Sequence, residues 1–163
     1  SLYEEIFNEE SKFSQDPLID LDEIVLDENL MKKLQNRFDK KITTVTGRGK
    51  FAFSYSMKNF LNNFDMQNSV FLEDRPLEQA KPNPKSLIES ISAIDSKCSL
   101  YIGDSMEDLL MVEKCKESGY DVSFCGIYGS SDEPESKFEL FQKNKASIII
   151  ESIQELPKAL NLV

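Results

Sequence analysis

The sequence predicts an α/β protein with a doubly wound, Rossmann-like parallel sheet and flanking helices. Two observations support this fold class. Short runs rich in β-branched and other apolar residues alternate with amphipathic segments along the chain, a pattern typical of βαβ units. The 163 residues, 40% of them hydrophobic, are also enough for one domain with a buried core.

The predicted elements follow one another in strict alternation. The first helix, 27–38, carries Leu30, Leu34 and Phe38 on one face. The other expected helices are 51–64, 84–94, 107–118, 135–145 and a last turn or two in 152–160. The expected strands are 42–46, 68–74, 98–103, 121–129 and 146–150. Upstream, residues 1–10 also show an apolar helical face, formed by Leu2, Tyr3, Ile6 and Phe7.

Charge and composition exclude several classes of function. The formal net charge is −10, whereas nucleic-acid binding needs a basic face, so we expect no nucleic-acid partner. The chain has no histidine, which excludes Ser–His and Cys–His nucleophile pairs and His-ligated metals. No apolar run reaches 18 residues, so we expect no membrane partner. The three cysteines lack metal-ligand spacing and indicate reduced, mostly buried thiols in a cytoplasmic protein.

Chemically distinctive residues follow two of the predicted strands. In open α/β sheets, ligands bind beyond the carboxyl ends of the strands. Thr46 ends one strand, and its hydroxyl and the N–H groups after Gly47 suit a phosphate oxygen at a helix start. An ordinary strand-to-helix turn is the alternative. Lys81 lies in a loop stiffened by Pro82 and Pro84, where it can neutralise a phosphate or a carboxylate. A solvated loop lysine is the alternative there.

A third strand end carries a cluster of acids in the stretch "LYIGDSMEDLL". Asp104 follows the strand directly and Asp108 comes four residues later. With a helix beginning near Ser105, both carboxylates can point toward the strand end. Mg²⁺ binds hard oxygen ligands, often one or two carboxylates with water and substrate phosphate. The alternative is an N-capping aspartate with acids that favour the helix dipole.

The order and spacing of these residues resemble the haloacid dehalogenase-like (HAD) superfamily. The segments "VTGR", "LEDRPLEQAKPNPKSL" and "YIGDSMEDLLMV" together look like its phosphatase-type subgroup, which has a helical cap inserted after the first motif. The similarity runs from about Ile24 to the C-terminus. It implies that residues 1–26 are the end of a helical cap and a linker, and that 27–163 form a HAD-like core.

The resemblance also implies the reaction: Mg²⁺-dependent phosphoryl transfer through an aspartyl-phosphate, which water hydrolyses. Thr46 and Lys81 would hold the phosphoryl oxygens, with Gly47 and Arg48 also binding the substrate. Lys81 would steady the nucleophile as well. Asp104 would ligate Mg²⁺. Asp108 would act at the same metal site, by orienting that ligand or a bound water.

One departure from the family pattern concerns the nucleophile, which should stand first, in an apolar strand ending in Asp-x-Asp. The chain has one such tripeptide, Asp20-Leu21-Asp22, and Asp16 and Pro17 before it spoil a central strand. In the family this strand lies in the middle of the sheet. We therefore expect a core that lacks its first strand, completed by an N-terminal segment or by a separate chain.

The leading interpretation is the C-terminal portion of a Mg²⁺-dependent cytoplasmic phosphatase that acts on a small phosphorylated metabolite. On this interpretation the nucleophile comes from outside the chain, so residues 1–163 alone are inactive. Two alternatives stay open. One is an inactive HAD-like binding or regulatory module, which the absent first motif favours. The other is a phosphomutase of the same superfamily.

Overall fold

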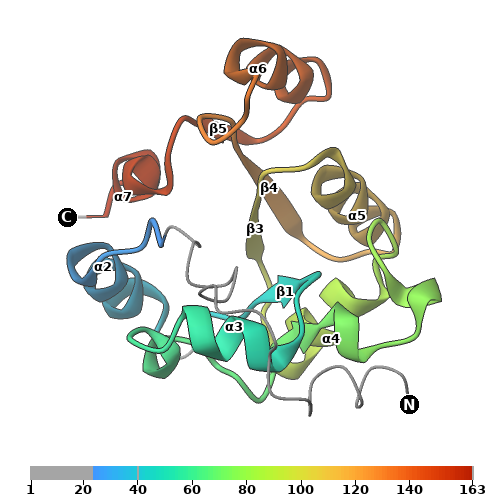
Figure 1. The fold of residues 1–163 in the computed structure, drawn as a ribbon. Helices are drawn as coiled ribbons and strands as arrows, with labels where there is room; N and C mark the ends of the chain where they lie inside the picture. The colour runs from blue at the N-terminus through green and yellow to red at the C-terminus, as the bar shows by residue number, and fades with distance from the viewer. Residues whose placement is uncertain (1–23, 40, 163) are drawn as a thin grey trace, which may run out of the picture.

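The computed structural model describes residues 24–39 and 41–162 and confirms the predicted fold class. Helices flank parallel strands, with α5 on one side of the central strands and α2 and α7 on the other (Figure 1). The strands are β1 (Val45–Thr46), β2 (Val70–Phe71), β3 (Ser99–Gly103), β4 (Val122–Ile127) and β5 (Ile148–Ile150). The α-helices are α2 (Glu28–Phe38), α3 (Lys50–Ser56), α4 (Lys85–Ala93), α5 (Met106–Glu117), α6 (Pro134–Lys143) and α7 (Leu156–Ala159). The 3₁₀ turns are η2 (Leu61–Asn63), η3 (Leu72–Asp74), η4 (Leu77–Gln79) and η5 (Ile153–Glu155).

The described strands form two parallel sheets. One contains β1 and β2, with Val45 opposite Val70; the other has the order β3-β4-β5. The predicted strands 42–46 and 68–74 shrink to two residues each. Residues 72–74, at the end of the second predicted strand, form the 3₁₀ turn η3 instead, and among the described residues β1 pairs with β2 alone. The predicted helix 51–64 is likewise shorter, because α3 ends at Ser56 and one 3₁₀ turn follows at 61–63.

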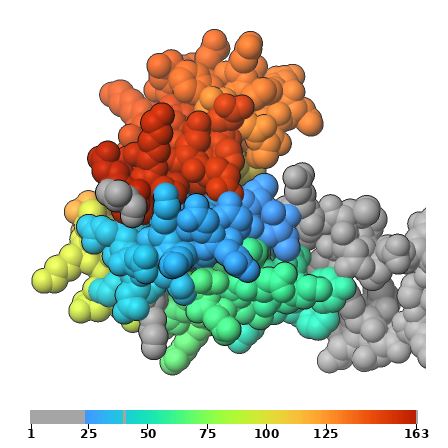
Figure 2. All heavy atoms as spheres, turned by 90° about the vertical axis from the view of Figure 1, so that its left-hand side faces the viewer, coloured from blue at the N-terminus to red at the C-terminus, as the bar shows by residue number. Residues whose placement is uncertain are grey.

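Helix α2 begins and packs as its sequence pattern predicts. The Asp27 carboxylate caps it by accepting a hydrogen bond from the Leu30 N–H at 2.8 Å. Leu30, Met31 and Leu34 are buried. Figure 2 shows this helix, in blue, between the red C-terminal segment and the green segment that follows β1. The apolar face of α2 therefore packs in one cluster with residues of both segments.

The apolar core has two clusters. The first joins β1, β2 and α4 to α5 and β4, and includes Val45, Leu87, Val112 and Phe124. The second lies under α2 and α7, around Leu30, Cys125 and Leu156. Each cluster covers a different face of the β3-β4-β5 sheet, so the strands are buried on both sides, as parallel sheets require.

Two of the three cysteines are buried, in line with the sequence-based expectation. Cys115 and Cys125 have no exposed surface, and burial raises the pKa of Cys125 to about 12. Cys98, at the start of β3, is exposed.

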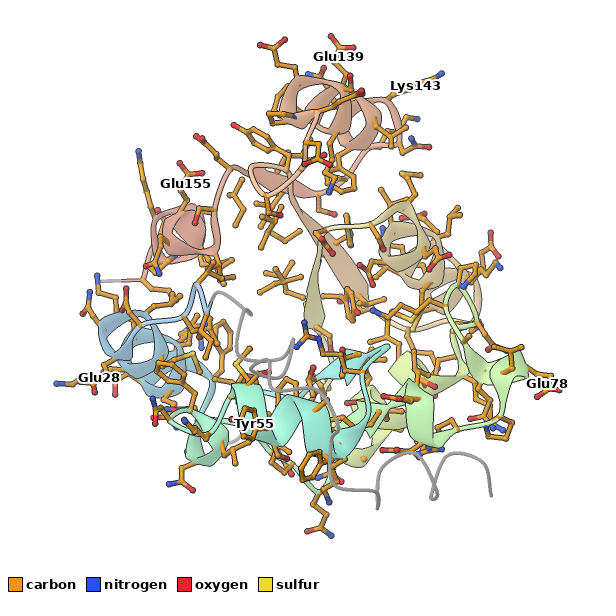
Figure 3. The ribbon with its side chains drawn as sticks, viewed as in Figure 1. Glu28, Tyr55, Glu78, Glu139, Lys143 and Glu155 are labelled. Atoms are coloured by element: carbon orange, nitrogen blue, oxygen red, sulfur yellow. The ribbon has the colours of Figure 1, made fainter. Side chains whose placement is uncertain are left out.

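Acidic side chains are spread over the described surface. Glu28, Glu78, Glu139 and Glu155 point outward from four separate elements (Figure 3). In the described part of the chain, no helix is long and apolar enough to cross a membrane. The expectations for 1–10, for Asp20-Leu21-Asp22 and for most of the cap remnant 1–26 lie outside the described residues.

Candidate functional site

Asp108 is the centre of a buried polar cluster where β3 leads into α5. The residue is buried, with 3% of its surface exposed. One carboxylate oxygen, Oδ1, lies 2.7 Å from the ammonium of Lys81 and 3.0 Å from the hydroxyl of Tyr101. The other, Oδ2, accepts hydrogen bonds from the Ser105 hydroxyl at 2.8 Å and the Ser105 N–H at 3.2 Å. Both oxygens are therefore bonded within the protein.

The local sequence explains why Asp108 points inward. Ser105 is the N-cap of α5, and Asp108 stands three residues later, so the two form a reciprocal capping box. The Ser105 hydroxyl accepts from the Asp108 N–H at 3.1 Å. A side chain added at Gly103 would place its Cβ 2.6 Å from the Asp108 carboxylate. Glycine at 103 is thus required by the close approach of this carboxylate to the strand end.

The polar groups around Asp108 keep its carboxylate charged although the residue is buried. Burial alone would raise the pKa of Asp108, but the charge and hydrogen bond of Lys81, together with the hydrogen bonds from Ser105 and Tyr101, outweigh it. The pKa of Asp108 therefore lies below its ordinary value. The same burial, with the Asp108 charge nearby, raises the pKa of Tyr101 and keeps its phenol neutral.

Lys81 is ordered by this cluster. Its side chain is 17% exposed, against 4% for that of Asp108, and its ammonium lies 5.6 Å from the centre of the Tyr101 ring. The peptide bond from Lys81 to Pro82 is cis. The alternative of a freely solvated loop lysine does not fit these contacts. An ammonium has three N–H donors, so the bond to Asp108 leaves capacity for an anionic ligand.

Tyr101 connects this cluster to the strand that carries Thr46. Its hydroxyl lies 2.9 Å from the carbonyl oxygen of Val45 as well as 3.0 Å from Asp108. The single phenolic proton is shared between these two acceptors. Lys81 and Asp108 are thus in direct contact, and Thr46 is joined to them through its neighbour Val45.

The loop after Thr46 bonds to acids from the next strand end. The Thr46 hydroxyl accepts from the Arg48 N–H at 3.2 Å. The Gly49 N–H donates to Glu73 at 2.6 Å, and the Lys50 N–H donates to Asp74 at 3.0 Å. The backbone N–H groups of Gly49 and Lys50, at the start of α3, are therefore already bonded to carboxylates. Gly47 is exposed beside open space, since a Cβ there would meet nothing within 4 Å.

Asp104 and Asp108 differ in their availability to a metal. Asp104 is exposed at the end of β3, whereas both oxygens of Asp108 are engaged. Among residues 24–39 and 41–162, no group of three or more acids or cysteines is close enough to hold a metal ion. Within the described chain, Asp104 is thus the one predicted ligand with a free carboxylate. Mg²⁺ commonly binds through only one or two carboxylates, with water and substrate oxygens.

Reasoning from the sequence missed Tyr101 and Ser105. Ser105 had a readable signal, because Ser-x-x-Asp before an apolar helix is typical of a capping box. Tyr101 had none: its role depends on the separation of β1 and β3, which no local pattern records.

Comparisons with known proteins agree with this fold. No family model matches the chain, and no curated protein matches it. The chain is similar to the crystal structure of a conserved haloacid dehalogenase-like protein of unknown function from Agrobacterium tumefaciens str. C58. The sequence identity is 15% and the TM-score 0.60, over 98% of this chain and 74% of that chain. At this identity the likeness shows the fold alone, and the fold is HAD-like.

Proposed function

We propose that this chain is the C-terminal portion of a Mg²⁺-dependent HAD-like phosphatase that hydrolyses a small phosphorylated metabolite. The observation that carries the proposal is the ion pair of half-buried Lys81 with buried Asp108, 2.7 Å apart, at the strand end that also carries Asp104. A lysine held there by a buried carboxylate is a fixed cation beside an exposed acid. That combination suits a phosphoryl group bridged to a metal ion.

Each residue then has a defined role. Lys81 binds a phosphoryl oxygen, and Asp108 fixes the direction of its ammonium through their direct bond. The Thr46 hydroxyl, Gly47 and Arg48 bind the other oxygens from the neighbouring strand end. The Thr46 hydroxyl accepts from the Arg48 N–H, so its own O–H remains available to donate to a phosphoryl oxygen.

The proposed metal site uses Asp104 as its ligand from this chain. Asp108 contributes by holding Lys81, since its oxygens are already bonded. When bound, Mg²⁺ would neutralise negative charge on the phosphoryl oxygens. The remaining carboxylate ligand is proposed to arrive with the nucleophile.

The attacking aspartate is proposed to lie outside the described residues. In these, Asp108 is engaged with Lys81, and Asp104 is assigned to the metal. The acids nearest Thr46, Glu73 and Asp74, bond to backbone N–H groups. A segment N-terminal to this chain, or a separate chain, would therefore carry the Asp-x-Asp motif. Without it the site can bind phosphate and metal but cannot form the phosphoenzyme.

Asp104→Asn in the complete protein tests the metal assignment. We expect Mg²⁺-dependent hydrolysis to fall by about 10²-fold or more, with unchanged circular dichroism. Glu107→Gln is the matched control, because Glu107 is an exposed acid in the first turn of α5, and it should retain activity. Unchanged turnover in the Asp104 variant would sink the assignment. A stable phosphoenzyme that depends on a sugar phosphate would instead favour the phosphomutase alternative.

A further inference from the structure

The loop that carries Lys81 is closed by Asn83. This loop joins the 3₁₀ turn η4 to α4. The Asn83 N–H donates to the carbonyl oxygen of Ala80 at 2.9 Å. Lys81 and Pro82 are therefore the two middle residues of a β-turn. The side-chain amide of Asn83 also donates to the carbonyl oxygen of Glu78 at 2.8 Å, so Asn83 bonds to two residues that precede the lysine.

The same side chain supplies the missing cap of α4. The residue at the N-cap position is Pro84, whose side chain makes no capping hydrogen bond. The Oδ1 atom of Asn83 accepts instead from the N–H of Lys85, the first residue of the helix, at 2.9 Å. An N–H in the first turn of a helix needs such a partner from outside the helix. One asparagine side chain thus bonds to Glu78 before Lys81 and to Lys85 after it.

Helix α4, to which Asn83 ties the loop, is fixed in the core. Leu87, on its buried side, belongs to the apolar cluster that joins β1 and β2 to α5. The hydroxyl of Ser90 lies 2.9 Å from Thr43 Oγ1 and 2.9 Å from the carbonyl oxygen of Asn68. The position of the loop relative to α4 therefore also sets its position relative to the β1-β2 sheet.

Lys81 has to reach from this loop to another helix. Its ammonium lies 2.7 Å from Asp108 on α5. A lysine ammonium is carried on a flexible four-carbon stem, so its direction depends on where the backbone is held. The loop has a second attachment to α4, the ion pair of Arg75 with Glu89 at 2.8 Å. That pair is more exposed and farther from the lysine along the chain, and exposed ion pairs are weak.

We propose that Asn83 is the positioning residue of Lys81, and that it fixes the lysine backbone by joining the loop to the first residue of α4. Asparagine suits this role because its side chain has both a donor and an acceptor, and each is used here. The ammonium is thereby aimed at Asp108 and, on the proposed function, at a phosphoryl oxygen. Only the phosphoryl contact rests on the proposed function; the aim at Asp108 does not.

Trace acetylation of lysines in the complete protein tests this placement without an assay of activity. Acetic anhydride is the probe, and mass spectrometry compares Lys81 with Lys143, which points outward from α6 (Figure 3). Lys81 should react slowly in the wild type, since its side chain is 17% exposed and bonded to Asp108. In Asn83→Ala we expect its rate relative to Lys143 to rise about two- to tenfold, the equivalent of one hydrogen bond.

Asn144→Ala is the matched control. Asn144 also bonds to a backbone carbonyl, that of Leu140 at 2.8 Å, but at the end of α6, so Lys81 should react at the wild-type rate. Alkylation of Cys115 by a maleimide is followed in parallel. This thiol has no exposed surface, so its protection should persist in every variant and exclude general unfolding.

Asn83→Ser removes half of the tie. A serine hydroxyl can still accept from the N–H two residues later, but it has no amide group to donate to Glu78. We expect Lys81 to react at a rate between those of the wild type and Asn83→Ala. A wild-type rate in Asn83→Ser would overturn the proposal, and this holds even where Asn83→Ala does not fold.

Two other results would also overturn the proposal. One is an unchanged rate of Lys81 acetylation in folded Asn83→Ala. The other is an equal acceleration in Arg75→Gln, because the loop as a whole, rather than Asn83, would then hold the lysine.

Turnover of p-nitrophenyl phosphate with Mg²⁺ separates this inference from the proposed function. Where the complete wild-type protein hydrolyses it, kcat/KM should fall about two- to tenfold in Asn83→Ala and stay unchanged in Asn144→Ala. Full kcat/KM in an Asn83→Ala protein with fast Lys81 acetylation would overturn the aim at a phosphoryl oxygen. No hydrolysis by the wild type would count against the proposed function, and the acetylation of Lys81 would still decide the role of Asn83.

Discussion

The contact between Lys81 and Asp108 is the residue-scale feature on which the candidate site depends. Removing two charges from water is costly, and the cost is offset only when the pair is close and its other groups are hydrogen-bonded. Here the separation is 2.7 Å, and Ser105 and Tyr101 bond to the same carboxylate. The arrangement fixes a lysine at the site, and each partner depends on the other.

Lys81→Met should destabilise the protein by about 3 kcal/mol, because it leaves a buried carboxylate without its cation. The measurement is urea denaturation followed by circular dichroism. Lys85→Met is the matched control, since Lys85 is exposed one turn away, and it should change stability by less than about 0.5 kcal/mol. Adding Asp108→Asn to Lys81→Met should recover part of the loss. No recovery in the double variant would contradict the ion-pair account.

Acid should weaken the fold through Asp108. Its pKa is lowered in the folded state, so the unfolded chain binds more protons below about pH 4. The stabilisation is complete above the unfolded pKa of about 4 and is lost as the pH falls through the folded pKa. The free energy of unfolding, measured from pH 6 to pH 2, should therefore fall more steeply for the wild type than for Asp108→Asn. Parallel curves would show that Asp108 is not held ionised.

At the scale of elements, α6 packs closely on β4 where Phe141 of the helix meets Gly126 of the strand. A Cβ added at Gly126 would lie 2.6 Å from the ring of Phe141, which has no exposed surface. That ring also meets Phe124 edge to face, with 5.5 Å between the ring centres. The glycine in β4 thus sets how closely the helix can approach the sheet.

Gly126→Ala should cost about 1–3 kcal/mol in unfolding free energy, because the Phe141 ring must move to admit the methyl group. Gly47→Ala is the control, since open space surrounds that position, and it should leave stability within about 0.5 kcal/mol. Thermal and urea unfolding of the two variants provide the comparison. Equal stabilities would show that Phe141 can move aside freely.

The elements could be predicted where a local pattern decides them. Helix 27–38 and strand 98–103 match α2 and β3 to within a residue or so, because their apolar spacing and caps lie in the sequence itself. Strand 42–46 was predicted too long, because the length of β1 depends on which strands pair with it, and the local sequence does not record this. Helix 51–64 was also too long, because no sequence signal marks the end of α3 at Ser56.

At the scale of the whole molecule, two parallel sheets are held together mainly by helices. Helix α2 covers one face (Figure 1). Between the sheets, the Tyr101 hydroxyl on β3 lies 2.9 Å from the carbonyl oxygen of Val45 on β1. The order of the predicted site residues indicated one end of a parallel sheet, and the contact of Lys81 with Asp108 is consistent with that. The sequence could not reveal that both carboxylate oxygens of Asp108 are bonded to neighbouring side chains, because this depends on the fold around it.

Phosphatase assays of residues 1–163, alone and with the proposed upstream segment, test the central claim of a split site most directly. The substrate is p-nitrophenyl phosphate with Mg²⁺. We expect no turnover by residues 1–163 alone, since the proposal assigns Asp104 to the metal and Asp108 is bonded to Lys81. We expect robust turnover once the segment with its Asp-x-Asp strand is added. Robust turnover by the isolated chain, lost on Asp20→Asn, would contradict the account and place the nucleophile within this chain.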